Sequence, residues 1–157
     1  MLYTKGRNLY AASLDVPGYI HATGTRISAA NSAHHERTSD WISVDGIDAV
    51  SIRSWATIGE NQQLWIGYAF YSSESMDDVI GTRVAKYGEE GTGKSETLSY
   101  INIAVPEGAK YMRVSHRSYS DGKCKVEYGT EATDWRPAPE DAQMFGGGGV
   151  ELYDPCS

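Results

Sequence analysis

The sequence is poor in cysteine and has no long apolar stretch. Cys124 and Cys156 are its only cysteines, too few for a disulfide scaffold or a four-ligand zinc site. We therefore expect two free thiols, with Cys124 buried. The longest apolar stretch, residues 64–71, has the length of a strand and falls far short of the roughly 20 residues that span a bilayer. Residues 1–7 also lack the apolar core of a signal peptide, so we expect no membrane partner.

Positive charge is also scarce. Acidic residues outnumber basic ones by 21 to 14, which gives a formal net charge of −7 and a sequence isoelectric point near 5.0. The chain contains no run of Lys and Arg. Because nonspecific binding to a phosphate backbone needs clustered cationic side chains, this balance argues against a nucleic-acid partner.

Helical periodicity is missing as well. No window combines an apolar repeat of 3.6 residues with helix caps, so we expect no long helix. The chain is instead rich in Tyr (11), Trp (4) and Gly (17), which suit half-buried sheets and tight turns. Alternating apolar and polar residues predict strands at residues 40–44, 49–55, 64–71, 79–87, 98–105, 110–116 and 123–128. Short strands at this spacing favour an all-β sandwich or barrel.

The alternation also predicts which side chains face the core, because successive side chains of a strand point to opposite faces. The inward sets are Val50 and Ile52, then Leu64, Ile66, Tyr68 and Phe70, and finally Met112 and Val114. The outward sets contain Tyr111 and six residues that we take as candidate ligand-binding residues: Arg53, Trp55, Trp65, Tyr71, Arg113 and Arg117. An outer sheet face normally carries Thr, Lys and Glu, so this enrichment in aromatic and Arg residues indicates that the face contacts something other than water.

Two interpretations of the outward set remain open. In the first, these side chains pack against neighbouring subunits or a covering loop. In the second, they recognise a sugar, because sugars offer C–H faces to aromatic rings and hydroxyl edges to Arg and Asp. Arg53, Trp55 and Tyr71 would then form a sugar platform. A face open to solvent favours ligand binding, and a face buried by a neighbour favours assembly.

Residues 88–95 match the phosphate-loop expression G-x-x-x-x-G-K-[ST]. A phosphate loop needs a helix directly after it, because the helix N-terminus supplies part of the anion site. Residues 96–106 alternate, are rich in β-branched side chains and end at a proline, so they predict a strand instead. Glu89 and Glu90 would also repel phosphates. We therefore expect a polar hairpin loop that binds no nucleotide.

Other catalytic or metal-binding patterns are weak. His34, His35 and Glu36, with Asp40 nearby, could suggest a metal site. Adjacent residues of a strand point in opposite directions, so loop histidines are the better interpretation. No nucleophile elbow and no paired acid and base can be recognised. We expect a protein that is not an enzyme and has no cofactor or metal.

The C-terminal part differs from the rest. Pro137 and Pro139 prevent a central strand, and residues 146–149 are four glycines, typical of a flexible linker. The tail at residues 150–157 carries Val150, Leu152 and Tyr153, which suit docking on another chain. We divide the chain into a leader (1–7), a domain (8–141), and a tether with a docking tail (142–157).

Two segments resemble a signature of tail proteins from phages of Gram-positive bacteria. Residues 108–115 read G-A-K-Y-M-R-V-S, and residues 125–141 read K-V-E-Y-G-T-E-A-T-D-W-R-P-A-P-E-D. The resemblance is most specific over residues 127–141, and the opening Gly6-Arg7-Asn8-Leu9 also resembles the start of such domains. In such a domain, Glu127 would close the last strand and Trp135 would cover one open end of the sandwich.

The resemblance implies an antiparallel two-sheet jelly-roll sandwich of about eight strands, similar to carbohydrate-binding modules and galactose-binding-like domains. Such domains sit on tail fibres, baseplates and distal-tail proteins, where they engage host cell-wall polysaccharide. We therefore expect a virion protein, made in the cytoplasm of the bacterial host, that is homo-oligomeric in the particle and contacts other virion proteins through residues 150–157. The alternative is a purely structural decoration, head-fibre or assembly protein.

Overall fold

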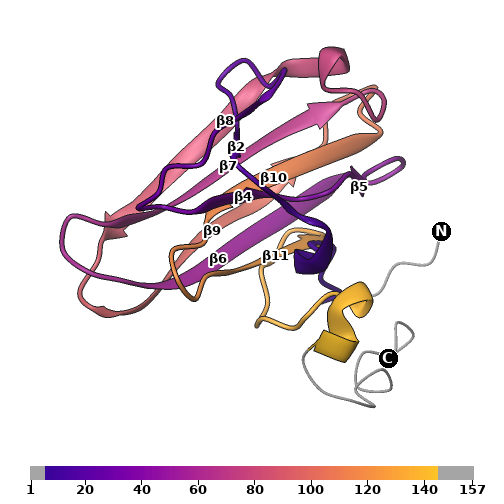
Figure 1. Cartoon of the computed structure of the whole chain (residues 1–157). Helices are drawn as coiled ribbons and strands as arrows, with labels where there is room; N and C mark the ends of the chain where they lie inside the picture. Colours follow the sequence, from indigo (N-terminus) through magenta and orange to yellow (C-terminus); the bar gives the residue numbers. More distant parts are fainter. Residues whose placement is uncertain (1–5, 145–157) are drawn as a thin grey trace.

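The computed structural model describes residues 6–144, and within them the fold is all-β. Two antiparallel sheets pack face to face as a sandwich (Figure 1). The larger sheet has the order β1 (Val16–Pro17), β4 (Glu36–Thr38), β10 (Tyr111–Arg117), β7 (Gln63–Tyr71) and β8 (Val79–Glu90), and β5 (Ile42–Ser43) also pairs with β10. The smaller sheet has the order β11 (Lys123–Tyr128), β6 (Ala49–Ile58) and β9 (Lys94–Ala104). A separate hairpin consists of β2 (Tyr19–Ile20) and β3 (Ile27–Ser28).

Helical structure within the described residues is limited to three 3₁₀ turns: η1 (Ala12–Leu14), η2 (Met76–Asp78) and η3 (Pro139–Met144). No helix among these residues is long and apolar enough to cross a membrane. The Asp141 carboxylate in η3 accepts hydrogen bonds from the Ala12 and Ser13 N–H groups at 2.6 and 3.1 Å, so the two ends of the domain meet. The expected limit at residue 141 therefore falls inside η3. Most of the expected leader, and the expected tether and tail from residue 145 on, lie outside the described residues.

The core between the two sheets is built from the side chains that the alternation predicts. All eight expected inward residues belong to it, which confirms this prediction: Val50, Ile52, Leu64, Ile66, Tyr68, Phe70, Met112 and Val114. Cys124 of β11 is buried in the same core, as expected, and burial raises the pKa of its thiol. Its expected lack of a bond to Cys156 concerns a residue outside the described part of the chain.

The β2–β3 hairpin covers part of the outer face of the larger sheet. Ile20 of the hairpin is fully buried together with Ala69 and Tyr71 of β7. The Tyr71 hydroxyl donates a hydrogen bond of 2.7 Å to the carbonyl oxygen of Gly24, in the turn between β2 and β3. This part of the outer face is therefore a second, smaller core, whereas the area beside the hairpin is open.

The segment that matches the phosphate-loop expression joins the two sheets. Residues 91–93 connect β8 to β9, so a strand follows where a phosphate site needs a helix, as predicted. The two strands belong to different sheets, so the connection is an arch across the sandwich and not the hairpin that we expected. The N–H groups of Gly91 and Gly93 already donate to the carbonyl oxygens of Gln62 and Ile58, at 2.9 and 2.7 Å. These amides are therefore not free to cradle a phosphate.

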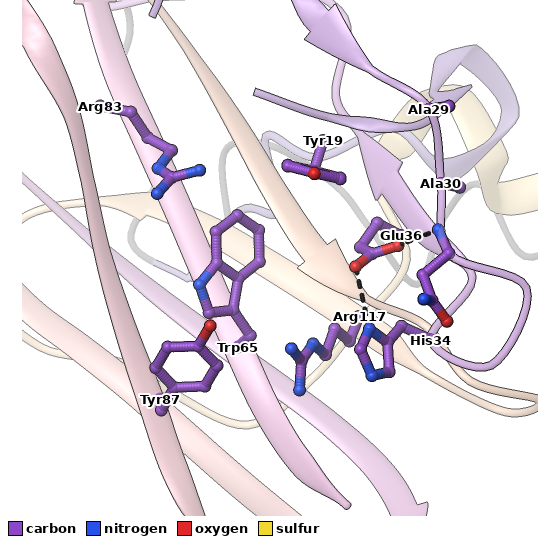
Figure 2. A pocket seen from close by; sticks show the side chains of 10 residues that line it. Tyr19, Ala29, Ala30, His34, Glu36, Trp65, Arg83, Tyr87 and Arg117 are labelled. Atoms are coloured by element: carbon purple, nitrogen blue, oxygen red, sulfur yellow. Dashed lines mark hydrogen bonds and ion pairs between the residues drawn. The ribbon is translucent and has the colours of Figure 1, made fainter. Parts of the chain in front are cut away.

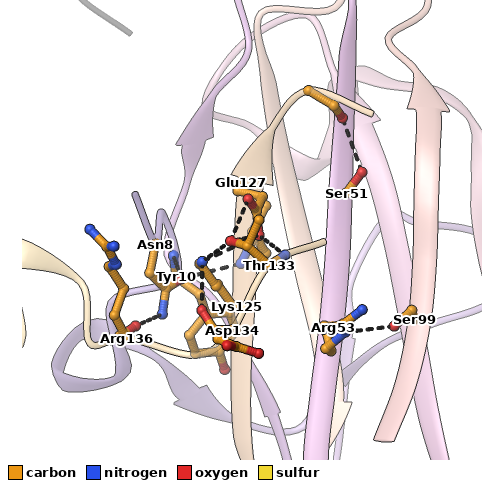
Figure 3. Close-up of polar contacts among 12 residues, drawn as sticks. Asn8, Tyr10, Ser51, Arg53, Ser99, Lys125, Glu127, Thr133, Asp134 and Arg136 are labelled. Carbon is orange, nitrogen blue, oxygen red and sulfur yellow. Dashed lines mark hydrogen bonds and ion pairs between the residues drawn. The ribbon is translucent and has the colours of Figure 1, made fainter. Parts of the chain in front are cut away.

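A buried polar cluster fastens the stretch after β11 to the smaller sheet (Figure 3). Lys125 and Glu127 lie on one face of β11 and form an ion pair of 3.4 Å, although both side chains are almost completely buried. Thr133 completes the cluster: its N–H donates to the Glu127 carboxylate at 2.9 Å, and its hydroxyl accepts from the Lys125 ammonium at 2.5 Å. Trp135 follows in the same stretch, and its ring centroid lies 4.5 Å from the Lys123 ammonium. This part of the signature thus has a structural role.

Candidate functional site

A groove of about 570 Å³ opens on the outer face of the larger sheet, beside the β2–β3 hairpin (Figure 2). Its main lining residues come from five strands: Tyr19 of β2, Glu36 of β4, Trp65 of β7, Arg83 and Tyr87 of β8, and Arg117 of β10. The loop between β3 and β4 adds Asn31 and His34. Sites for small ligands have volumes of roughly 300–1,000 Å³, so this groove is large enough for one.

Trp65 forms one wall because Gly67, two residues later on the same face of β7, has no side chain. A Cβ atom at Gly67 would lie 2.6 Å from the Trp65 ring and 3.2 Å from Cδ of Arg83. In the space left free, the Arg83 guanidinium stacks 5.2 Å from the centroid of the indole. Tyr19 meets the same indole edge to face at 6.0 Å. Trp65 is thereby held from two sides and keeps only 5% of its surface exposed.

Tyr87 is the cross-strand partner of Trp65 on β8, and it forms a second stacked pair with Arg117. The Arg117 guanidinium lies 5.2 Å from the centroid of the Tyr87 ring. Its Nη1 donates a hydrogen bond of 3.0 Å to the Gln63 carbonyl oxygen, which fixes the position of the group. Tyr87 is 58% exposed, so its ring is the most accessible aromatic surface of the site.

Glu36 is the buried carboxylate of the groove, and its oxygens already have partners. One accepts the N–H of Asn31 at 2.7 Å, and the other lies 3.2 Å from Nδ1 of His34. Figure 2 shows these two contacts as dashed lines on the side of the groove opposite Trp65. Glu36 therefore holds the loop that forms this wall. Its carboxylate is turned toward that loop and makes no ion pair with Arg83 or Arg117.

The six candidate ligand-binding residues predicted from the sequence lie in three different places in the structure. Trp65 and Arg117 line the groove. Tyr71 and Arg113 lie on the same side of the sandwich but in the cluster beneath the hairpin, where Trp41 contacts both: its ring centroid is 5.0 Å from that of Tyr71 and 5.1 Å from the Arg113 guanidinium. Burial raises the pKa of Tyr71 to about 12 and lowers the pKa of Arg113. For this pair, packing under a covering loop accounts for the outward aromatic and Arg side chains.

Arg53 and Trp55 lie on the opposite side of the molecule, on the outer face of the smaller sheet. The Arg53 guanidinium is 5.8 Å from the Trp55 ring centroid, and its Nε donates to the Ser99 hydroxyl at 2.8 Å. Tyr71 belongs to the other sheet and is completely buried. The expected platform of Arg53, Trp55 and Tyr71 is therefore not formed.

Four of the six main lining residues were not among the candidate ligand-binding residues: Tyr19, Glu36, Arg83 and Tyr87. Arg83 and Tyr87 are four residues apart in a run that was predicted to be a strand, so the alternation places them on one face. That signal was present in the sequence. The sequence contains no comparable signal for Tyr19, because β2 has only two residues and reaches the groove only when the hairpin folds over β7.

A second hollow, of about 250 Å³, lies near η1 and contains a buried histidine. His116 is completely enclosed, and its Nδ1 has no hydrogen-bond partner. Burial, with a smaller contribution from the positive charge of Arg37, lowers the pKa of His116 to about 4. Tyr10 packs edge to face on its ring at 5.3 Å. This histidine is a neutral core residue at ordinary pH.

The described residues include no cluster of three or more His, Cys, Asp or Glu side chains suited to a metal ion. His34 and His35 lie in the loop before β4, as the loop interpretation expects. Comparisons of the chain with family models, curated proteins and solved structures gave no match.

Proposed function

We propose that this chain is a non-enzymatic saccharide-binding module of a phage particle. One observation carries the proposal: accessible aromatic rings and fixed guanidinium groups line a single groove of ligand size. The C–H face of a sugar ring packs on an aromatic ring, and its hydroxyl groups bond to polar groups at the edge. Tyr87 and Tyr19 offer the rings here, and Arg83, Arg117 and Asn31 offer the polar edge.

We further propose that the sandwich is a jelly roll. From β6 on, the chain alternates between the sheets: β6 is in the smaller sheet, β7 and β8 in the larger, β9 in the smaller, β10 in the larger and β11 in the smaller. Such crossings are typical of Greek-key and jelly-roll sandwiches. The resemblance at residues 108–115 and 127–141 supports a place on the virion, with host cell-wall polysaccharide as the ligand.

A glycan array with bacterial cell-wall polysaccharides tests the saccharide proposal. We expect binding that is lost in Tyr87→Ala, because Tyr87 offers the most exposed ring of the groove. Trp55→Ala is the matched control, since it removes a partly exposed aromatic side chain from the opposite sheet. Binding that depends on Trp55 and not on Tyr87 would place the site on the smaller sheet. Failure of the wild-type protein to bind any polysaccharide would refute the proposal.

A structural role in assembly is the second candidate, and the long edge strands favour it. β8 and β9 border their sheets, and Val84 and Ile101 on these strands are 39% and 55% exposed. Unpaired edges with apolar side chains are prone to pair with another chain. Light scattering after size exclusion distinguishes the candidates: a stable oligomer that Val84→Lys dissociates favours assembly, and a monomer that binds polysaccharide favours the saccharide module.

A further inference from the structure

We infer that the groove selects acidic saccharides, whose carboxylate or phosphate groups are bound by Arg83 and Arg117. The inference rests on the proposed saccharide function and adds the chemical class of the ligand. The guanidinium groups of Arg83 and Arg117 flank Trp65 in Figure 2. Both are held in place, and both have hydrogen-bonding groups without a partner.

Each guanidinium uses only part of its hydrogen-bonding capacity. A guanidinium has five N–H groups, and within the described residues only Nη1 of each arginine is engaged. Arg83 donates to the Ile20 carbonyl oxygen at 2.9 Å, and Arg117 donates to the Gln63 carbonyl oxygen at 3.0 Å. Nε of both arginines is buried without a partner. A ligand cannot reach an enclosed Nε, so the donors that the groove offers are the Nη2 groups, which no described residue engages.

Neither guanidinium has a negatively charged neighbour within ion-pair distance among the described residues. Two other cations of the fold, by contrast, are ion-paired: Arg37 lies 2.6 Å from the Asp15 carboxylate, and Lys125 lies 3.4 Å from Glu127. The carboxylate of the groove, Glu36, is engaged by the loop. In a chain with a net charge of −7, two unpaired arginines in one hollow are a local excess of positive charge.

The stacked geometry prepares both groups for anions that offer paired oxygens. Each guanidinium lies over an aromatic ring, Arg83 over Trp65 and Arg117 over Tyr87, at the same centroid distance of 5.2 Å. Stacking occupies the faces of a guanidinium, so the N–H groups at its edge that have no partner in the protein can bond to the oxygens of a carboxylate or a phosphate. Because the side chains are already ordered, little conformational entropy is lost when an anion binds. A neutral sugar can use the same rings, but it lacks the charge that these edges favour.

Matched polysaccharides test the inference. An array would carry acidic bacterial polysaccharides beside the same material after reduction of the carboxyl groups to alcohols, and phosphorylated polysaccharides before and after removal of the phosphate. We expect at least tenfold weaker binding after one of these treatments, and the effective treatment identifies the source of the anion. Binding to the acidic form should also weaken as the salt concentration rises, because salt screens the charges.

Three variants connect the effect to the groove. Arg117→Gln and Arg83→Gln should each weaken binding to the acidic form about tenfold and leave binding to the neutral form nearly unchanged. Arg83→Lys retains the charge but loses the planar edge, and should fall between wild type and Arg83→Gln. The control is Arg53→Gln, which removes an arginine stacked on Trp55 on the other sheet. Thermal melting of each variant shows whether it is folded.

The outcomes separate this inference from the proposed function. If acidic and neutral forms bind equally and the Arg83 and Arg117 variants bind like wild type, while Tyr87→Ala abolishes binding, the selectivity for anions is wrong and the saccharide site stands. If the array detects no polysaccharide of either kind, both fail. Equal losses in Arg53→Gln and the groove variants would also overturn the inference, because a general charge effect would then explain the result.

Discussion

Adding one methyl group at Gly67 should displace the two residues that form the central wall of the groove. Gly67→Ala places a Cβ atom 2.6 Å from the Trp65 ring and 3.2 Å from Cδ of Arg83. Carbon atoms in contact prefer separations of about 3.5–4.0 Å, so the indole must move by roughly 1 Å. Arg83 stacks on that indole and would have to move with it.

The size of the effect follows from two opposing contributions. Overpacking of this kind costs about 1–3 kcal/mol. Alanine restricts the unfolded chain more than glycine, which offsets about 0.4–1 kcal/mol of that cost. We expect a net loss on the order of 1–2 kcal/mol in the free energy of unfolding, which lowers the Tm of a chain of this length by about 2–8 °C. Loss of the stacked Arg83 should also weaken binding of an acidic saccharide by roughly tenfold, since cation–π pairs contribute about 0.5–2 kcal/mol.

Three measurements check the Gly67 prediction: thermal denaturation, the indole N–H signals in a ¹H–¹⁵N NMR spectrum, and polysaccharide binding. Gly59→Ala is the matched control, because a Cβ atom there would meet only the Gln62 side chain, at 3.9 Å. We expect the control to leave the indole signals and the binding unchanged and to raise the Tm slightly, because it restricts the unfolded chain without a clash in the folded one. A Gly67→Ala protein with the Tm, the indole signals and the binding of wild type would refute the claim that Gly67 positions Trp65 and Arg83.

Three further predictions concern the rest of the molecule. Glu127→Gln leaves the buried Lys125 ammonium without its charged partner and should lower the free energy of unfolding, measured by urea denaturation, by about 3–5 kcal/mol. The control Glu60→Gln changes an exposed side chain and should have little effect. A loss below about 1 kcal/mol in Glu127→Gln would contradict the role given to the ion pair. His116 has a pKa of about 4 in the folded protein and a pKa near 6.5 in the unfolded chain. Between these pH values the unfolded state binds more protons than the folded state. The free energy of unfolding should therefore fall by up to roughly 3 kcal/mol as the pH drops from 6.5 to 4. His116→Phe should flatten that dependence, and an equally steep curve in the variant would show that other groups cause it. Calorimetry with Mg²⁺-ATP should detect no binding, because a strand follows the Gly91–Gly93 arch; micromolar affinity that Lys94→Ala abolishes would contradict this.

The strands of the core and the orientation of their side chains could be predicted from local sequence patterns alone. Alternation within a strand depends only on local backbone geometry, so Val50, Ile66 and Met112 could be assigned to the core without knowledge of their neighbours. The strand after the phosphate-loop match was also predictable, because β-branched residues and a terminal proline are local signals. The short strands β1 to β4 escaped prediction, since segments of two or three residues contain no measurable period.

Which of the outward side chains form a site depends on how distant segments pack in the folded chain. Trp65 and Tyr71 lie on the same face of β7, yet the hairpin seals Tyr71 completely, while Trp65 remains in a groove wall. The hydrogen bond that closes this cover joins Tyr71 to Gly24, 47 residues earlier in the chain. Trp55 has the same local pattern but lies on the other sheet. Whether an outward aromatic residue is packed or open depends on contacts between distant segments, and alternation along one strand carries no information about them.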